Sequence, residues 1–318
     1  MANWHQRAVE VLRRDWGLAA EPTVPETGWT NLTWQAGHFW LTCRPAGQAD
    51  RLRREIELFA RINRESPHSG VCAPVTVPTS DGRCYAEAYD HVWRLTETLA
   101  GVEPPSSRLA HYPVIGAAVA RLHAVLAGFD GRPAVLDEGV LSRVLGLITE
   151  EPPAAITALQ FADQACLDHG LKAVEAGYDR LASADRQLLH GDPGPSNIRT
   201  DPRTMALVGA LDLDGAGVGP VAFDLAAVGI GAFSWWHAPG FDPVAALAGA
   251  LDEYRRRGGR PVDPAAVYLC MLAKEIRLLR SMLVGAIPRK PDGPWVDWYL
   301  ARYRRILRAW SEQPWRSA

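Results

Sequence analysis

The segment HGDPGPSN at positions 190–197 places Asp192 and Asn197 five positions apart in one short loop. Asp212 follows fifteen residues after Asn197, at the end of an apolar stretch, 207–213, that is typical of a β-strand. Asn197 offers a neutral oxygen and Asp212 a charged one, and this pair suits a hard cation that keeps several waters. The carboxylate of Asp192 can accept a proton from a hydroxyl group. The segment therefore predicts a base and two metal ligands in one pocket.

The spacing H-G-D-x-x-x-x-N matches the catalytic loop H-R-D-x-x-x-x-N of protein kinases. Transfer of the γ-phosphoryl group of ATP needs a hydroxyl held in line, a carboxylate that accepts its proton, and Mg²⁺ that neutralises the phosphates. We therefore predict that Asp192 is the catalytic base and that Asn197 and Asp212 bind Mg²⁺. His190 is predicted to support the loop and not to react.

Further motifs lie along most of the chain: RRE at 53–55, VWRL at 92–95, LAG at 99–101, ARLH at 120–123, LDLDGAGVG at 211–219 and FDLA at 223–226. Together with the loop, they make the chain resemble the aminoglycoside phosphotransferase and choline kinase-like superfamily. The resemblance implies an α+β protein with a bilobal protein-kinase-like fold. It implies that residues 1–99 form a small β-rich nucleotide-binding lobe and residues 100–318 a larger, mostly helical catalytic lobe, in which 130–185 is expected to be a variable helical substrate region.

The resemblance also implies roles for individual residues. ATP is expected between the lobes, with backbone groups near Glu97 and Leu99 on the adenine. A loop that includes Gly28 and Asn31 is expected near the phosphates, although it is poor in glycine. Asp224 is expected to be buried and hydrogen-bonded to the catalytic loop.

The chain departs from the superfamily at one position. Many members have a basic residue on the strand before the helix that carries Glu55, but here the alignment places Thr42 at that position, and the first lysine of the chain is Lys172. Arg44 lies two residues further, on the same strand face, and is the predicted substitute. Glu55 lies on the apolar stripe of a helix predicted over about 50–62, so its carboxylate needs a cation or strong hydrogen-bond donors.

Charge and cysteine usage exclude several classes of partner. The chain has 318 residues, a net charge of −2 and five cysteines without a C-x-x-C motif. Such a charge gives no broad basic field, so neither nucleic acid nor an anionic membrane is the expected partner. The cysteines argue against a disulfide framework or a structural zinc and favour the cytoplasm. A helix predicted over 5–17 is amphipathic and unlike a signal peptide, and no apolar run of 18 residues is expected.

The remaining pattern divides the chain into two parts. Residues 25–44 and 71–98 are predicted to form strands, with turns at Gly37–His38, Asp81–Gly82 and Asp90–His91. Beyond a loop at about 100–107 the pattern is mostly helical, and 207–213 is the one stretch predicted to be extended.

The favoured function is an ATP- and Mg²⁺-dependent O-phosphotransferase that acts on a small polar or cationic molecule, such as an aminoglycoside, an aminocyclitol or an amino sugar. Acidic residues at 137, 138, 150, 151, 163 and 168 could contact its amino groups, and Trp235–Trp236 could line its pocket. A kinase of homoserine, choline or a sugar is the alternative within the same chemistry. A pseudokinase that binds nucleotide and acts as a partner protein is a third possibility, motivated by the absent lysine. The oligomeric state stays open.

Overall fold

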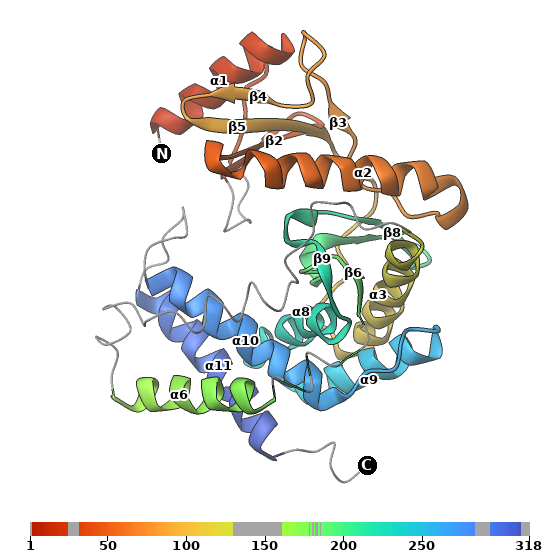
Figure 1. Cartoon of the computed structure of the whole chain (residues 1–318), viewed down its shortest axis with the longest axis vertical. Coiled ribbons are helices and arrows are strands. Elements are labelled where there is room, and N and C mark those ends of the chain that lie inside the picture. Colours follow the sequence, from red (N-terminus) through yellow and green to blue (C-terminus); the bar gives the residue numbers. More distant parts are fainter. Residues whose placement is uncertain are drawn as a thin grey trace. The chain divides into compact units, whose positions relative to one another are not determined.

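The computed structural model describes residues 2–24, 32–129, 161–177, 186–283 and 293–312, together with 179, 181 and 184. The described chain forms two compact units (Figure 1). The N-terminal unit contains the residues up to Ala100 together with Gly209–Asp214, and the C-terminal unit contains Gly101–Val208 and the chain from Gly215 onward. The first unit is rich in β-structure and the second is mostly helical, which confirms the predicted α+β class.

The N-terminal unit is built on a five-stranded antiparallel sheet with strand order β1-β2-β5-β3, in which β4 also pairs with β5. Thr42 of β2 lies opposite Arg94 of β5, and Arg44 lies opposite Val92. The elements of this unit are α1 (Ala2–Trp16), β1 (Leu32–Ala36), β2 (Phe39–Pro45), η1 (Ala46–Gln48), α2 (Ala49–Ser69), β3 (Thr76–Val77), β4 (Ala86–Ala88) and β5 (His91–Glu97).

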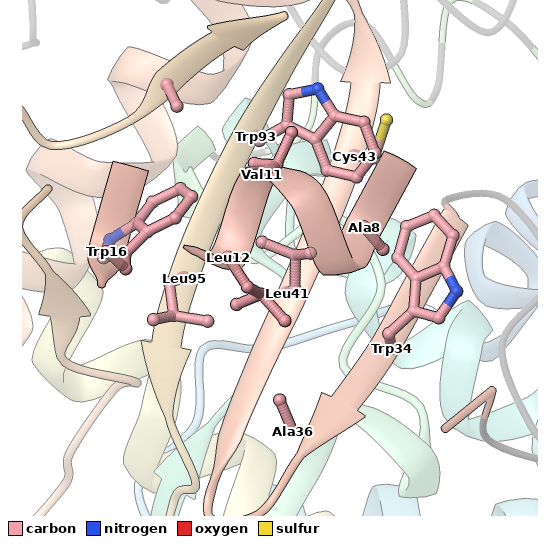
Figure 2. Packing of buried hydrophobic residues seen from close by; sticks show 11 residues of the cluster. Ala8, Val11, Leu12, Trp16, Trp34, Ala36, Leu41, Cys43, Trp93 and Leu95 are labelled. Atoms are coloured by element: carbon pink, nitrogen blue, oxygen red, sulfur yellow. The ribbon is translucent and has the colours of Figure 1, made fainter. Parts of the chain in front are cut away.

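Helix α1 covers part of this sheet and forms a hydrophobic core with it. Its side chains at positions 8, 11, 12 and 16 recur at helical spacing and are buried. Figure 2 shows them packed among Trp34, Leu41, Trp93 and Leu95, which project from β1, β2 and β5. The N-terminal helix predicted from its amphipathic pattern is therefore part of the core of this unit.

Two boundaries differ from those expected. Helix α2 continues seven residues past the predicted end and stops at Ser69, where Gly70 adopts φ 64° and its amide donates to the Ser66 carbonyl. The β4–β5 turn is formed by Tyr89 and Asp90, one residue earlier than predicted, and both have φ near +57°. Two successive positive φ angles match the right-handed twist of a tight hairpin.

The C-terminal unit packs its helices around the segment that carries residues 190–197. It contains three short strands that the sequence analysis missed, because strands of three or four residues are too short to show an alternating pattern. Strand β6 pairs with β9, and β7 pairs with β8. The elements of this unit are η2 (Leu109–His111), α3 (Tyr112–Ala127), α6 (Phe161–Ala176), β6 (Arg186–Leu189), η3 (Pro195–Asn197), β7 (Ile198–Thr200), β9 (Gly217–Pro220), α8 (Ala222–Phe233), α9 (Pro243–Arg256), α10 (Pro264–Leu283) and α11 (Gly293–Glu312). Two elements, β8 (Leu207–Ala210) and η4 (Leu213–Gly215), are shared with the N-terminal unit, which contains Gly209–Asp214.

Among the described residues, one stretch, Leu109–Ala127, is long and apolar enough to cross a membrane by length and composition, although Arg121 and two histidines interrupt its apolar run. The stretch contains α3, whose side chains Ile115, Val119, Leu122 and Leu126 are buried within the C-terminal unit. Its apolar character is explained by this buried position, since a helix packed on most sides is hydrophobic around most of its surface.

Candidate active site

Asp224 holds the loop 190–197 in place, the segment predicted to be catalytic. The loop begins directly after β6, and Asp224 lies in the first turn of α8, where it is completely buried. Its two carboxylate oxygens accept hydrogen bonds from the amides of His190 and Gly191, at 2.9 and 2.8 Å. Two neighbouring amides bound to one carboxylate leave the backbone of the loop little freedom.

The charge of Asp224 is stabilised by His123, the histidine of the ARLH motif at 120–123. His123 Nε2 lies 3.0 Å from Asp224 Oδ2 and donates to it, while His123 Nδ1 lies 2.8 Å from the Tyr254 hydroxyl. Burial opposes the charge, but the hydrogen bond from His123 and the proximity of His123, His190 and Lys274 outweigh it, so the pKa of Asp224 is lowered.

Gly191 allows the loop to approach the chain that follows Asp212. It adopts φ 93°, and a Cβ at this position would lie 2.2 Å from the Gly215 carbonyl oxygen. Both the positive φ and the close backbone contact require glycine. The sharp turn at Gly191 leaves the side chain of Asp192 63% exposed.

Asp192 is held through its backbone, and its side chain faces solvent. Its amide donates to His190 Nδ1 at 3.3 Å, and its carbonyl accepts from Asn197 Nδ2 at 2.9 Å. His190 is therefore placed where it supports the loop. The amide nitrogen of Asn197 is used for this contact, which leaves its side-chain oxygen for another ligand.

In the N-terminal unit, two arginines share the buried carboxylate of Glu55. Arg44 Nη2 donates to Oε2 at 2.7 Å, and Arg94 Nη2 donates to Oε1 at 3.2 Å. All three residues are at least 95% buried. Sequence reasoning missed Arg94, which lies across the sheet from Thr42, the position where a basic residue was expected.

Arg44 also links Glu55 to the acidic segment that ends β8. Its Nη2 lies 3.8 Å from Asp212 Oδ1 and 3.7 Å from Asp214 Oδ2, within the same unit. Burial alone would lower the pKa of Arg44, but Glu55, Asp214 and Asp212 raise it. Asp212 adopts φ 51°, a conformation that costs free energy in a non-glycine residue and is concentrated at functional sites.

The residues present fit a nucleotide with its metal. The Nε and Nη1 atoms of Arg44 and the Nε atom of Arg94 are buried without a hydrogen-bond partner, while Arg94 Nη1 lies 3.1 Å from Glu55 Oε2. Such atoms gain free energy from an anionic ligand. The described residues contain no group of three or more His, Cys, Asp or Glu side chains that could hold a metal. The amide of Asn197 and the carboxylate of Asp212 suit Mg²⁺, which is usually bound by one or two carboxylates, phosphates and water.

The other predicted nucleotide contacts are only partly described. Gly28 and Asn31 lie outside the described residues, as do the acids at 137, 138, 150 and 151. The amide of Glu97 donates to the Val75 carbonyl at 2.9 Å, so it is already engaged. The Leu99 side chain packs against Gly209, where a Cβ would lie 2.5 Å from Leu99 Cδ2.

A cavity of about 590 Å³ adjoins the catalytic loop in the C-terminal unit. Three indole rings line it, one of which belongs to the predicted Trp235–Trp236 pair, and Trp235 Nε1 donates to the Ser106 hydroxyl at 3.1 Å. The lining residues are Glu103, Ser106, Pro195, Ser196, Gly231, Ser234, Trp235, His237, Trp295 and Trp298.

Arg302 and Asp163 fix the helices around this cavity. Arg302 pairs with the buried Glu275 at 2.6 Å, donates to the Ser234 hydroxyl at 2.8 Å and lies 4.7 Å from the centroid of the Trp298 ring. Asp163, one of the acids considered for the substrate, is paired with Arg304 in the described structure. Asp163 therefore contributes to helix packing in this arrangement.

Comparison with solved structures shows the fold. A microcompartment-associated aminopropanol kinase has 16% sequence identity and a TM-score of 0.72, covering 96% of this chain and 97% of that chain. The amicoumacin kinase hAmiN, in complex with AMP-PNP, Ca²⁺ and Ami, has 14% identity and a TM-score of 0.69, covering 97% and 94%. The aminoglycoside phosphotransferase APH(3'')-Id from Streptomyces rimosus has 20% identity and a TM-score of 0.58, covering 86% and 98%.

No match was found among curated proteins. The sequence profile described as the phosphotransferase enzyme family matches residues 22–264, which include the catalytic loop, Glu55, Asp212 and Asp224. This match confirms the resemblance inferred from the motifs. The chain belongs to the phosphotransferase enzyme family.

Proposed function

We propose that this protein is an ATP- and Mg²⁺-dependent kinase that transfers a phosphoryl group to a hydroxyl of a small amine-bearing molecule. The observation that carries the proposal is the loop 190–197, in which an exposed carboxylate, Asp192, stands on a backbone fixed by Asp224. An exposed aspartate on a backbone fixed in this way is not required for a turn that has only a structural role, and it suits a catalytic base. We place the protein in the cytoplasm, where ATP is available.

In the proposed reaction a bond forms between the acceptor oxygen and the γ-phosphorus, and the bond from this phosphorus to its bridging oxygen breaks, which releases ADP. Asp192 accepts the proton that leaves the acceptor hydroxyl. Mg²⁺ would neutralise phosphate charge, held by Asn197 and Asp212. Arg44 and Arg94 keep Glu55 paired, and Arg44 Nε and Nη1 together with Arg94 Nε, which have no hydrogen-bond partner, are the candidates for a phosphate contact. His190 and Asp224 hold the loop.

The cavity beside Pro195 and Ser196 is the proposed acceptor site. Its indole rings can contact an ammonium group or an apolar ring, and Glu103 can pair with an ammonium. These features favour aminoglycosides, aminocyclitols and amino sugars as acceptors. The printed names of an aminopropanol kinase and an aminoglycoside phosphotransferase among similar folds support the same choice. Homoserine, choline and sugars are the alternative acceptors.

A pseudokinase that acts only as a binding partner is the competing hypothesis. It was motivated by the missing lysine, but Arg44 and Arg94 supply two buried cations to Glu55. ADP release across a panel of amino sugars, aminoglycosides, amino alcohols, homoserine and neutral sugars separates the hypotheses. A kinase releases ADP only with certain acceptors, whereas a pseudokinase binds ATP and releases none with any of them.

We expect ATP to stabilise the protein in thermal unfolding only when Mg²⁺ is present, and Asp212→Asn to reduce this stabilisation. Asp212 is the charged member of the proposed ligand pair, so its neutralisation leaves the metal less well bound. Ligand-induced shifts in Tm with ATP, with and without Mg²⁺, measure the effect. Equal shifts with and without Mg²⁺ in the unmodified protein would contradict the metal site.

We expect Arg44→Ala to raise KM for ATP by tenfold or more, about 1.4 kcal/mol, with little change in the acceptor KM. The substitution removes a guanidinium that contacts Glu55 and lies near Asp212, while Arg94 still pairs with Glu55. Steady-state kinetics measure the change. Arg53→Ala, which removes an exposed arginine from α2, is the control. If Arg44→Ala binds ATP normally, another group holds the phosphates, and the loop that includes Gly28 and Asn31 becomes the prime candidate.

A further inference from the structure

Lys274 contacts the catalytic loop from α10. Lysine is rare in this chain, with three among 34 basic residues. Lys274 Nζ donates to the Gly191 carbonyl oxygen at 2.5 Å and lies 3.6 Å from Asp192 Oδ1. Its side chain is only 11% exposed. The sequence analysis did not predict a role for Lys274, although a chain with only three lysines has few candidates for a lysine that acts at the site.

The contact completes a clamp on Gly191. The amide of this residue donates to Asp224, and its carbonyl accepts from Lys274, so both ends of the residue are held by charged groups. The ammonium also lies 4.1 Å from the centroid of the Phe223 ring. Burying an ammonium costs free energy unless it is paired. Here its partners are a carbonyl, an aromatic face and the carboxylate of Asp192, all at or beside the loop.

The compact shape of the lysine head group fits this position. An ammonium is a point charge that directs three donors, whereas a guanidinium is a wide, flat fork. The other charged groups packed nearby have partners of their own. Glu275, the next residue of α10, pairs with Arg302 of α11, and Asp224 of α8 is bound to His123 and the loop amides. Lys274 is therefore placed to act on Asp192.

We propose that Lys274 is a positioning residue for phosphoryl transfer, which holds Gly191 and orients the carboxylate of Asp192 toward the acceptor hydroxyl. The proposal rests on the proposed kinase function. It assigns Lys274 an effect on the chemical step and none on the binding of ATP, because its contacts are to the loop that carries the base. A misplacement of about 1 Å in a reacting group can cost on the order of 10²-fold in rate.

The first test compares Lys274→Met with Arg277→Met, which removes an exposed cation from the same helix. With an acceptor identified by the panel, we expect Lys274→Met to lower kcat on the order of 10²-fold. KM for ATP and the Tm shift with ATP and Mg²⁺ should stay close to those of the unmodified protein, and Arg277→Met should retain its kcat. Wild-type kcat in Lys274→Met, or a loss confined to KM for ATP, would overturn the proposal.

The second test asks whether Lys274 acts through Asp192. In an Asp192→Asn background we expect Lys274→Met to change the single-turnover rate less than about twofold, because residues that act as a unit are not additive. The same fold-loss in both backgrounds would indicate a purely structural role and overturn the proposal. If Lys274→Met does not fold, the same single-turnover rates are compared for Lys274→Gln, whose amide can still donate to Gly191. Absence of transfer by the unmodified protein to every acceptor would instead refute the kinase function itself.

Discussion

Asp192→Asn is expected to fold normally and to lose phosphoryl transfer by about 10²–10⁴-fold. The substituted amide has nearly the shape of the carboxylate but cannot accept the proton of the acceptor hydroxyl. The fold should survive because the loop is held by the backbone of Asp192 and by Asp224, while the Asp192 side chain is largely exposed. Measurements of kcat and of Tm on the same preparation test both halves of this expectation.

The matched control is Asp252→Asn, which neutralises an exposed aspartate on α9 that is paired with Arg255. It should leave kcat and Tm unchanged, since an exposed ion pair contributes about 0–1 kcal/mol. If Asp192→Asn keeps more than half of the wild-type kcat, Asp192 is not the catalytic base.

Glu55→Ala is expected to produce the largest loss of stability, about 3–5 kcal/mol in the free energy of unfolding. Glu55 is buried between Arg44 and Arg94, and its removal leaves two buried guanidinium groups without their carboxylate. Urea unfolding, followed by circular dichroism, measures the change.

Glu57→Ala, on the exposed side of the same helix, is the control and should change the free energy of unfolding by less than about 0.5 kcal/mol. A loss in Glu55→Ala as small as that of Glu57→Ala would mean that the two arginines find other partners, and the account of this cluster would be wrong.

Local periodicity explains how much of the site the sequence could predict. The 3.6-residue period places Glu55 on the buried face of α2, and the two-residue period of β2 places Arg44 on the same side of the strand as Thr42. In the structure, the side chains of Arg44 and Glu55 are hydrogen-bonded to each other. The spacing of Asp192 and Asn197 likewise reflects one tight loop, whose residues contact each other through local hydrogen bonds.

Arg94 and His123 lie in quoted motifs, but their contacts were not predicted, and Lys274 was missed altogether; all three reach the site from distant parts of the chain. Arg94 lies on β5, which pairs with β2, and His123 contacts Asp224 from α3. Lys274 contacts Gly191 from α10, 83 positions further along the chain. No local pattern specifies such contacts, because they arise from tertiary packing. The strands β6, β7 and β9 were missed because each gains its stability from a partner strand and shows no period of its own.

Transfer of label from ATP labelled in its γ-phosphoryl group to an amine-bearing alcohol, in the presence of Mg²⁺, tests the kinase function itself. We predict a labelled phosphate ester with the unmodified protein, and a rate lower by about 10²–10⁴-fold with Asp192→Asn. Binding of ATP without label in any acceptor of the panel, or equal transfer by the two proteins, would contradict it.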